Sequence, residues 1–259
     1  SSTTKYWNEA SALSNTIPVR PGYAFTYWTT NADGSGARYN AGANIPYDAN
    51  ANLKLYAQWK ASQYTNTLIY NANGGSGAPA SQTTTVTFPN TRSTFTVSSS
   101  KPTRTGYTFA GWYDAASGGN KIGSTVTVGS NSNTGNQSRT IYAHWTANQY
   151  TNTLSYNANG GSGAPDSQTT TVTFPNTQST FTVSSTKPTR TGYTFAGWYD
   201  AATDGNKIGS TVTVGSSSNA GNQSKTIYAH WTANQYTNTL IYNANGGSGA
   251  PASQTATVT

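Results

Sequence analysis

Few side chains in this sequence could carry acid–base or nucleophilic chemistry. General acid–base catalysis needs titratable groups that are held together, and a His–Asp pair beside a Ser or Thr hydroxyl is the arrangement that this composition offers. Both histidines lie in the motif Tyr-Ala-His-Trp, at residues 142–145 and 228–231. The copy of this motif at residues 56–59, however, has Gln58 in place of the histidine. We therefore predict no catalytic residues and a non-enzymatic protein. The titratable candidates are His144, His230, Glu9, Asp33, Asp48, Asp114, Asp166, Asp200 and Asp204.

Metal and cofactor sites are equally poorly supplied with ligands. Cysteine is absent from the 259 residues, which excludes disulfides and zinc–thiolate sites. The loop at residues 157–166, NANGGSGAPD, offers amide and carbonyl oxygens but lacks the clustered carboxylates of a calcium loop. The sequence therefore predicts no metal site and no cofactor.

The charged residues give no sign of a nucleic-acid surface. The formal net charge is +7, but the 14 Lys and Arg residues are scattered, and only the pair Lys101/Arg104 recurs, as Lys187/Arg190. Nucleic-acid-binding proteins concentrate basic residues on one face, so we predict no nucleic-acid partner. The sequence has no run of 18 apolar residues, which predicts no membrane insertion. The lack of both Cys and Met suits an oxidising environment and favours an extracellular location.

The recurring residues with distinctive chemistry are aromatic. The motif Gly-Tyr-x-Phe-x-x-Trp occurs at residues 22–28, 106–112 and 192–198, and the last two copies are followed 33 residues later by another tryptophan. Such rings either fill the core of a small module or stack on sugar rings at an exposed surface. We favour the core. The candidate residues under both hypotheses are Tyr107, Trp112, Tyr113, Trp145, Tyr193, Trp198, Tyr199 and Trp231.

Alternating residues predict the strands that position these rings. In residues 82–88, 93–97 and 123–129, Val or Phe alternates with Thr, which is typical of half-buried strands. Strand alternation cannot place Tyr107, Phe109 and Trp112 on one face, so we expect a bend or bulge at Gly111. The predicted fold class is mostly β, with little helix.

The chain is a tandem array. Residues 63–148 and 149–234 are two full repeats that differ at nine positions, residues 1–62 are a diverged partial repeat, and residues 235–259 are the opening hairpin of a further repeat. An alternative phasing divides the chain at 1–84, 85–170 and 171–256. Such strict periodicity predicts small modules that pack on their neighbours. We expect the last hairpin to pack on a neighbouring repeat or on the N-terminus of another copy.

Three motifs in fixed order resemble the Listeria–Bacteroides repeat, also described as the internalin B-type repeat, of secreted bacterial cell-surface proteins. They are Ala-Asn-Gly-Gly at 72–75, the segment 102–113 and Ile-Tyr-Ala-His-Trp at 141–145, and they return at 158–161, 188–199 and 227–231. The resemblance covers residues 16–259. It implies a β-grasp-like module and no catalytic residues to carry over, although this chain has a longer stretch between the first two motifs.

Three functions are compatible with such an array. The first is an extracellular structural repeat that forms a stalk or fibre of a bacterial surface or adhesion protein. The second is a self-assembling filament subunit, completed head-to-tail by strand or hairpin exchange. The third is an adhesin module that binds cell-surface or matrix glycans through its aromatic faces. The expected partners are accordingly neighbouring repeats, other copies of the chain, and glycans.

Overall fold

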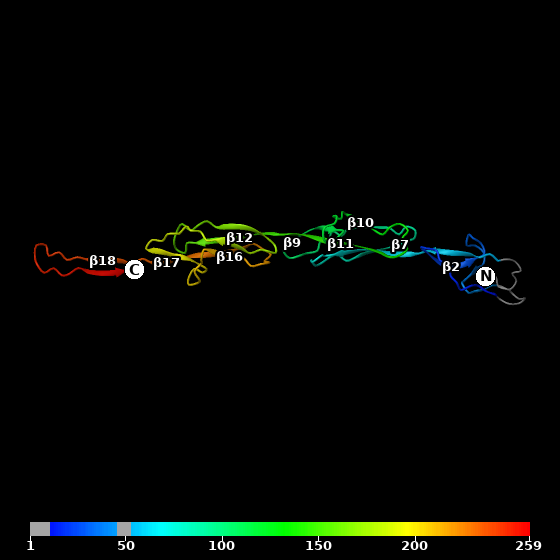
Figure 1. Cartoon of the computed structure of the whole chain (residues 1–259), viewed down its shortest axis with the longest axis horizontal. Coiled ribbons are helices and arrows are strands. Elements are labelled where there is room, and N and C mark those ends of the chain that lie inside the picture. Colours follow the sequence, from blue (N-terminus) through cyan, green and yellow to red (C-terminus); the bar gives the residue numbers. More distant parts are fainter. Residues whose placement is uncertain (1–10, 46–52) are drawn as a thin grey trace. The chain divides into compact units, whose positions relative to one another are not determined.

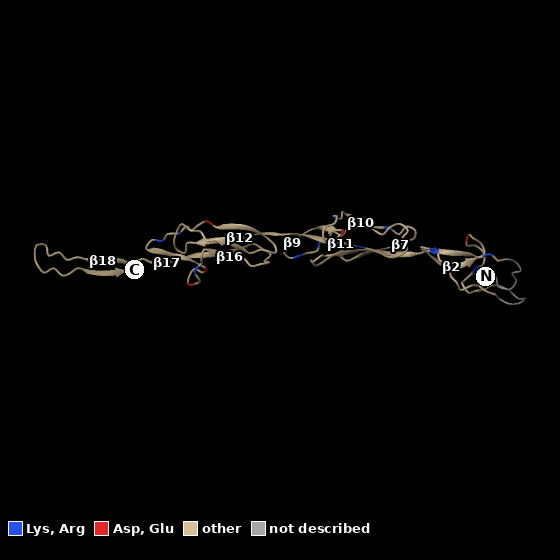
Figure 2. Ribbon diagram, in the orientation of Figure 1, with Lys and Arg blue, Asp and Glu red and all other residues tan. Residues whose placement is uncertain are grey.

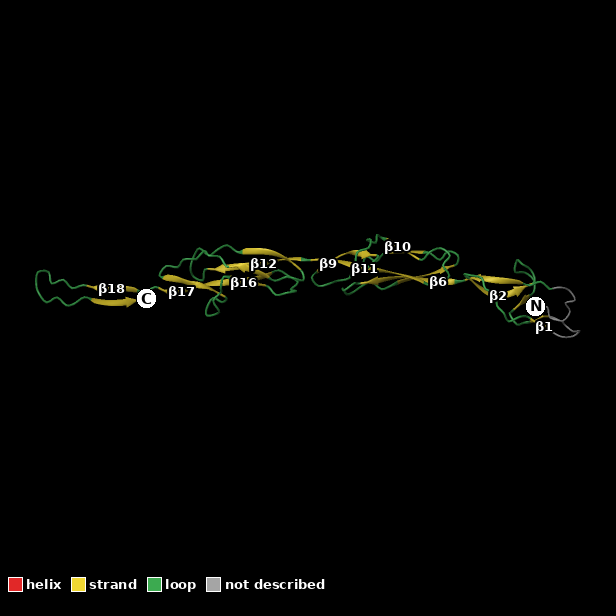
Figure 3. Cartoon of the chain, in the orientation of Figure 1, coloured by secondary structure: helices red, strands yellow, loops and turns green. Residues whose placement is uncertain are grey.

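The structure is a computed structural model and describes residues 11–45 and 53–259. These residues form strands and loops and no helix (Figure 1, Figure 3). The prediction of a mostly β chain of repeated modules is confirmed. The chain divides into two compact units, residues 1–104 with 109–145 and residues 105–108 with 146–259. Of the predicted titratable candidates, Glu9 and Asp48 lie outside the described residues.

The second module, residues 63–147, contains six strands. Three of them, β7, β8 and β10, lie where the sequence alternates Thr with Val or Phe, because a strand with one face on a core needs this alternation. The strands are β6 (Gln63–Asn71), β7 (Gln82–Thr87), β8 (Ser93–Thr96), β9 (Tyr107–Tyr113), β10 (Thr125–Val128) and β11 (Gln137–Ala147).

Four of these strands form one mixed sheet in the order β7-β6-β11-β9. β6 and β7 are an antiparallel hairpin. β6 and β11, the first and last strands of the module, pair in parallel, from Asn66 opposite Gln137 to Asn71 opposite Tyr142. Parallel neighbours need a long crossover connection, and here strands and loops provide it in place of a helix.

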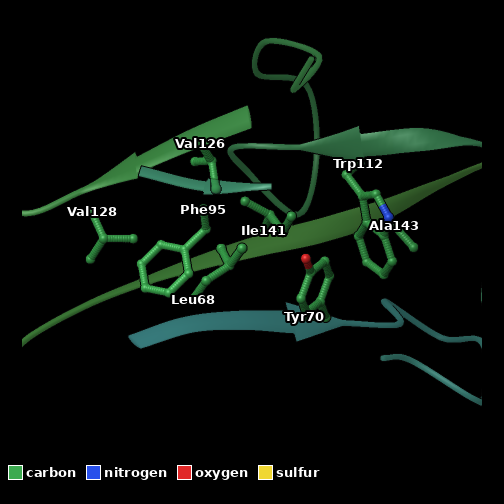
Figure 4. Packing of buried hydrophobic residues seen from close by; sticks show 8 residues of the cluster. All are labelled: Leu68, Tyr70, Phe95, Trp112, Val126, Val128, Ile141 and Ala143. Atoms are coloured by element: carbon green, nitrogen blue, oxygen red, sulfur yellow. The ribbon is translucent and has the colours of Figure 1, made fainter. Parts of the chain in front are cut away.

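β8 and β10 form a separate antiparallel pair that packs on this sheet, with Phe95 opposite Val126. The core takes side chains from both sheets, as Figure 4 shows. Leu68 and Ile141, from the parallel pair, are both 0% exposed. The core therefore lies directly against the parallel pair of strands. Burying a side chain of this size stabilises a fold by about 1.5–3 kcal/mol.

The third module, residues 149–233, repeats this architecture. Its four-stranded sheet has the order β13-β12-β17-β15, and β14 pairs with β16. Leu154 and Ile227 take the places of Leu68 and Ile141 and are also 0% exposed. The strands are β12 (Gln149–Asn157), β13 (Gln168–Thr173), β14 (Ser179–Thr182), β15 (Tyr193–Tyr199), β16 (Thr211–Val214) and β17 (Gln223–Ala233).

A β-bulge interrupts the aromatic strand of each module. Gly111 and Gly197 both have φ near +142°, and the pairing of β15 with β17 shifts register between Phe195 and Gly197. The bend expected from the spacing of the three aromatic residues is therefore present. The N-terminal copy has the same shift, between Phe25 and Tyr27, so the bulge itself does not require glycine.

The first module, residues 11–45 and 53–61, is the body of a repeat. Its sheets have the orders β3-β2-β5 and β1-β4, which correspond to the parts of a full module around β9, β11, β8 and β10. Its described residues contain no counterpart of the β6–β7 hairpin. The strands are β1 (Ser11–Ala12), β2 (Tyr23–Thr29), β3 (Arg38–Tyr39), β4 (Asn44–Ile45) and β5 (Tyr56–Ala61).

The terminal hairpin, residues 236–258, consists of β18 (Tyr236–Leu240) and β19 (Gln254–Val258), which pair antiparallel. All residues from 235 to 259 are exposed. Leu240 is 54% exposed, whereas its counterparts Leu68 and Leu154 are 0% exposed. The hairpin thus has the backbone pairing of its copies without the body that buries them.

Candidate functional site

Trp112 and Trp198 lie in the cores of their modules. Each is 5% exposed. The Trp112 ring packs edge-on against Tyr70, with 5.0 Å between the ring centroids (Figure 4), and against Phe109 at 5.3 Å. Edge-to-face pairs of this kind add about 0.5–1.5 kcal/mol to the effect of burial. An indole that is covered in this way has no face open to a sugar ring.

Trp145 and Trp231 fasten the glycine-rich loop of each hairpin to the sheet. Trp145 Nε1 donates to the carbonyl oxygens of Ala72 and Asn73, at 3.1 Å each, and Trp231 makes the same two bonds in the third module. Gly75 lies against the Trp145 indole, where a Cβ atom would be 2.4 Å from the ring. These half-buried rings therefore hold the Ala-Asn-Gly-Gly loop, and the loop must present a glycine to them.

Tyr113 and His144 form a stacked pair. Their ring centroids are 3.8 Å apart and their planes differ by 9°. His144 Nε2 donates to the carbonyl oxygen of Ala115 at 2.9 Å. Tyr199 and His230 form the same pair at 3.9 Å. Both histidines are therefore held between a tyrosine ring and a loop carbonyl, where they position the loop after the aromatic strand.

Asp114 closes the same loop. Its carboxylate accepts hydrogen bonds from the Asn120 backbone N at 2.7 Å and from Asn120 Nδ2 at 3.3 Å. These bonds, with a smaller effect of the Arg139 charge, hold the pKa of the Asp114 carboxyl below its usual value. Asp200 accepts the same bonds from Asn206, and its pKa is lowered in the same way. The histidine and the aspartate beside each loop thus bond to different groups and not to each other.

Tyr23, in the first unit, defines a contact that joins a module to the next hairpin. The Phe88 ring packs edge-on against Tyr23 at 5.3 Å, and a Cβ atom at Gly22 would be 2.5 Å from that ring. Ser62 N donates to Gly22 O at 2.9 Å, and Ser62 O accepts from Phe88 N at 3.0 Å. Within the second unit, the same contact links Gly106, Tyr107, Asn148 and Phe174, with 5.2 Å between the two rings.

Tyr193, the third tyrosine of this kind, is open to solvent. It is 38% exposed, and the Arg190 guanidinium lies 4.0 Å from its ring centroid. Two adjoining clefts of about 530 Å³ and 410 Å³ open here, and both are lined by Arg190, Tyr193 and Trp231. The first cleft is also lined by Lys187 and the second by Asp204 and His230.

The basic pairs singled out in the sequence do not form a basic surface. Figure 2 shows Lys, Arg, Asp and Glu scattered singly over strands and loops of both units. Arg20 and Arg190 each lie 4.0 Å from the ring centroid of the tyrosine three residues later. Arg190 of the recurring pair, and Arg20 at the equivalent position of the first module, are therefore partners of aromatic rings.

Buried asparagines are the positions that sequence reasoning missed. Asn66 and Asn152 are 0% exposed. Asn66 Nδ2 donates to the Thr91 carbonyl at 2.9 Å and to Ser93 Oγ at 2.8 Å, which ties β6 to the segment that leads into β8. The available signal was the recurrence of Tyr-Thr-Asn-Thr-Leu at the start of each hairpin, with a polar residue at an inward position.

Two features are absent from the described ranges, residues 11–45 and 53–259. No group of three or more His, Cys, Asp or Glu side chains in these ranges could hold a metal ion. Nor do these ranges contain a helix long and apolar enough to cross a membrane.

The geometry defines a class of protein: a tandem array of small β modules with aromatic cores. The chain belongs to the Listeria–Bacteroides repeat family, because the Listeria-Bacteroides repeat domain matches residues 1–58, 67–144 and 153–230. The resemblance drawn from the three motifs is therefore confirmed.

Relatives of this chain include much longer proteins. A putative Gly-rich membrane protein of Evansella cellulosilytica is 28% identical over 253 residues, 94% of this chain and 24% of that protein. Internalin H of Listeria monocytogenes is 38% identical over 106 residues, 41% of this chain and 16% of that protein. A putative membrane protein of E. cellulosilytica is 26% identical over 191 residues, 71% of this chain and 23% of that protein. The chain thus spans a quarter or less of these relatives.

Proposed function

We propose that this chain is a non-enzymatic, extracellular structural repeat of a bacterial surface protein and acts as a load-bearing spacer for other domains. Membership of the Listeria–Bacteroides repeat family supports this proposal. So does similarity to Internalin H and to two proteins described as membrane proteins. The contacts of the aromatic side chains support it as well, because most of these rings hold module parts together.

The observation that carries the proposal is the parallel pairing of the first and last strands of a full module. The chain enters the second module at the start of β6 and leaves it at the end of β11. Because the strands are parallel, these points lie at opposite ends of the pair. A pull on the chain therefore acts along the strands and loads the register pairs from Asn66–Gln137 to Asn71–Tyr142 together. The third module has the same geometry in β12 and β17.

Short connectors join the last strand of one module to the first strand of the next. A single residue, Ser62, separates β5 from β6, and Asn148 alone separates β11 from β12. Their backbone groups are hydrogen-bonded to Gly22 and Phe88, and to Gly106 and Phe174. Force entering a module therefore meets a strand at once, with no flexible linker to extend first.

Single-molecule force spectroscopy on the chain, held at its two ends, tests this role. Two unfolding events of equal length are expected, each of about 280–310 Å less the folded length, because 86 residues extend by about 3.3–3.6 Å each. The Ile69→Pro variant should lower the force of one event, since proline removes a backbone donor from a central strand. Ile69→Ser is the matched control, because the third module has a serine, Ser155, at the position equivalent to Ile69. Equal forces for the Pro and Ser variants would reject the proposed loading of this ladder.

Glycan binding is a second candidate function, and the clefts beside Tyr193 favour it. Tyr193 is 38% exposed and lines both clefts with Trp231, and exposed rings can stack on sugars. The measurement is a glycan-array experiment with the unmodified chain and two variants. Any glycan that binds the unmodified chain should not bind Tyr193→Ala. It should still bind Tyr107→Ala, because the Tyr107 ring packs on Phe174. No binding to any glycan, or equal loss in both variants, would reject this function.

A further inference from the structure

The hairpin loop of each full module contains the dipeptide Asn-Gly, at residues 73–74 and 159–160. In the second module this dipeptide is the centre of a tight turn, in which the Gly75 backbone N donates to Ala72 O at 3.0 Å. Asn73 has φ +47° and Gly74 has φ +85°. A turn with two positive φ angles favours asparagine followed by glycine. The backbone of the turn therefore selects this dipeptide.

The same dipeptide carries a known chemical weakness. Asparagine is thermolabile, most of all before glycine, which has no Cβ atom to obstruct the reaction. The glycine backbone N attacks the asparagine Cγ, an N–Cγ bond forms, the Cγ–Nδ2 bond breaks, and ammonia leaves. Water then opens the cyclic imide at one of its two carbonyls, which gives aspartate or isoaspartate. The asparagine side chain must turn toward the glycine nitrogen for this reaction, so restraints on that side chain slow it.

The folded second module restrains Asn73 at the nitrogen that would leave. Asn73 Nδ2 donates to Ala116 O at 2.8 Å and to Ala143 O at 2.9 Å, which joins the turn to the loop after β9 and to β11. Asn73 O accepts from Trp145 Nε1 at 3.1 Å, and Asn73 N donates to Asn71 Oδ1 at 2.8 Å. Both the side chain and the backbone of this residue are therefore held by the body and loop of the module.

The third module repeats these restraints. Asn159 Nδ2 donates to Ala202 O at 2.7 Å and to Ala229 O at 2.9 Å. Asn159 O accepts from Trp231 Nε1 at 3.1 Å. Asn159 and Gly160 also have positive φ angles, +48° and +86°. The same reactive dipeptide is thus held in the same way in both full modules.

We propose that Asn73 and Asn159 are deamidation sites that the closed modules protect and that opening of the hairpin loop exposes. Reaction at Asn73 requires that the bonds of its Nδ2 to Ala116 O and Ala143 O break first. A carboxylate only accepts hydrogen bonds, so the product leaves both carbonyls without this donor. Each deamidation therefore weakens the attachment of the hairpin to its module permanently. The extent of deamidation records how long a module has been open.

Incubation of the 259-residue chain at mildly alkaline pH, followed by tandem mass spectrometry of its tryptic peptides, tests the protection. Peptides 61–92 and 140–190 report Asn73 and Asn159 separately. Both sites should deamidate at least about tenfold more slowly than the free peptide of residues 70–77, because two or more hydrogen bonds must break first. Equal rates in the chain and in the free peptide would overturn the proposal.

The Trp145→Phe variant tests whether opening of the loop controls the reaction. It removes the indole donor to Asn73 O, so deamidation at Asn73 should become faster. Asn159 is the control within the same chain, because Trp231 still holds its loop, and it should keep its slow rate. The Trp231→Phe variant should reverse the two results. Equal rates at the two sites in either variant would contradict control by the local loop.

Two aspartate variants test the consequence of deamidation. Asn73→Asp removes the Nδ2 donor, and hydrogen exchange of the second module should become about tenfold faster. Asn71→Asp is the matched control: it makes the same change of charge two residues away, and Asn71 Oδ1 is an acceptor that a carboxylate oxygen can replace. Equal exchange in the two variants would reject the proposed weakening. No force is applied in these experiments, so their outcome is independent of the spacer role.

Discussion

The first module and the second module build the same aromatic cluster, although only the second has a hairpin. The ring centroid of Phe25 lies 5.2 Å from that of Trp28 and 6.0 Å from that of Trp59. In the second module the ring centroid of Phe109 lies 5.3 Å from that of Trp112 and 5.8 Å from that of Trp145. Both modules place a bulge in the aromatic strand. The cluster is therefore a property of the body of the module, and the hairpin covers a surface that exists without it.

The two modules differ in how they satisfy one loop carbonyl. In the second module His144 Nε2 donates to Ala115 O at 2.9 Å while its ring stacks on Tyr113. In the first module, threonine and glutamine replace this pair: Thr29 Oγ1 donates to Asn31 O at 2.9 Å and accepts from Gln58 Nε2 at 2.7 Å. Each carbonyl lies two residues after the residue at the end of the aromatic strand. The constant requirement is a donor to that carbonyl, and the histidine is one way to meet it.

The largest expected effect is a loss of stability when a tryptophan of the aromatic cluster is removed, and it should differ between the second module, where the hairpin covers the cluster, and the first module. Trp112→Ala should destabilise the second module by about 3–5 kcal/mol, because it leaves a cavity in a closed core. Trp28→Ala should cost the first module less, since Trp28 is half-buried and water already reaches it. Hydrogen exchange followed by mass spectrometry reports the opening of each module separately. Equal losses in the two modules would contradict the view that the hairpin completes the core.

The next effect compares the two hairpins at the same residue. Asn66 Nδ2 is buried and donates to Thr91 O and Ser93 Oγ, so Asn66→Ala should cost about 1–3 kcal/mol. Asn238 has the same sequence neighbours but is exposed, and Asn238→Ala should leave the stability of the modules unchanged. Urea unfolding of the two variants checks this pair. A comparable loss from Asn238→Ala would mean that the terminal hairpin is covered in solution.

The two hairpins also show what the sequence could predict. Alternation of Thr with Val and Phe located β7, β8 and β10, and the spacing of Tyr107, Phe109 and Trp112 located the bulge, because these features depend on local periodicity. The burial of Asn66 could not be predicted in the same way. Its partners lie 25 and 27 residues away, and the nearly identical Asn238 segment is exposed. Burial is decided by the body that packs on a strand, so identical segments can have opposite environments.

A smaller effect tests the exchange of the loop donor between modules. His144→Gln alone should cost about 0.5–1.5 kcal/mol, since it removes the donor to Ala115 O and the stack on Tyr113. Tyr113→Thr combined with His144→Gln recreates the pair of the first module, and part of the loss should be recovered. The measurement is a double-mutant cycle by urea unfolding. If the double variant is no more stable than His144→Gln, the two arrangements are not equivalent.

The smallest effect concerns the carboxylate that closes the loop in each module. Asp114 accepts from Asn120, and Asp33 of the first module accepts from Ser35 N and Oγ. The pKa of each carboxyl is lowered by these bonds. A lowered folded-state pKa adds stability above the unfolded value, about 3.9, and that stability is lost as the pH falls through the folded-state pKa.

Asp114→Asn should therefore reduce the acid sensitivity of the second module while changing its stability little at neutral pH, because an amide oxygen can still accept from Asn120 N. Urea midpoints at neutral pH and at about pH 3 measure the difference. Asp166→Asn is the control: the first full repeat has Ala80 at this position, and among the described residues no hydrogen bond to the Asp166 carboxylate is present. The same pH slope in Asp114→Asn and the unmodified chain would show that loop closure does not depend on the ionised carboxylate. Loss of the slope would identify the ionised Asp114 carboxylate as a pH-sensitive part of the loop.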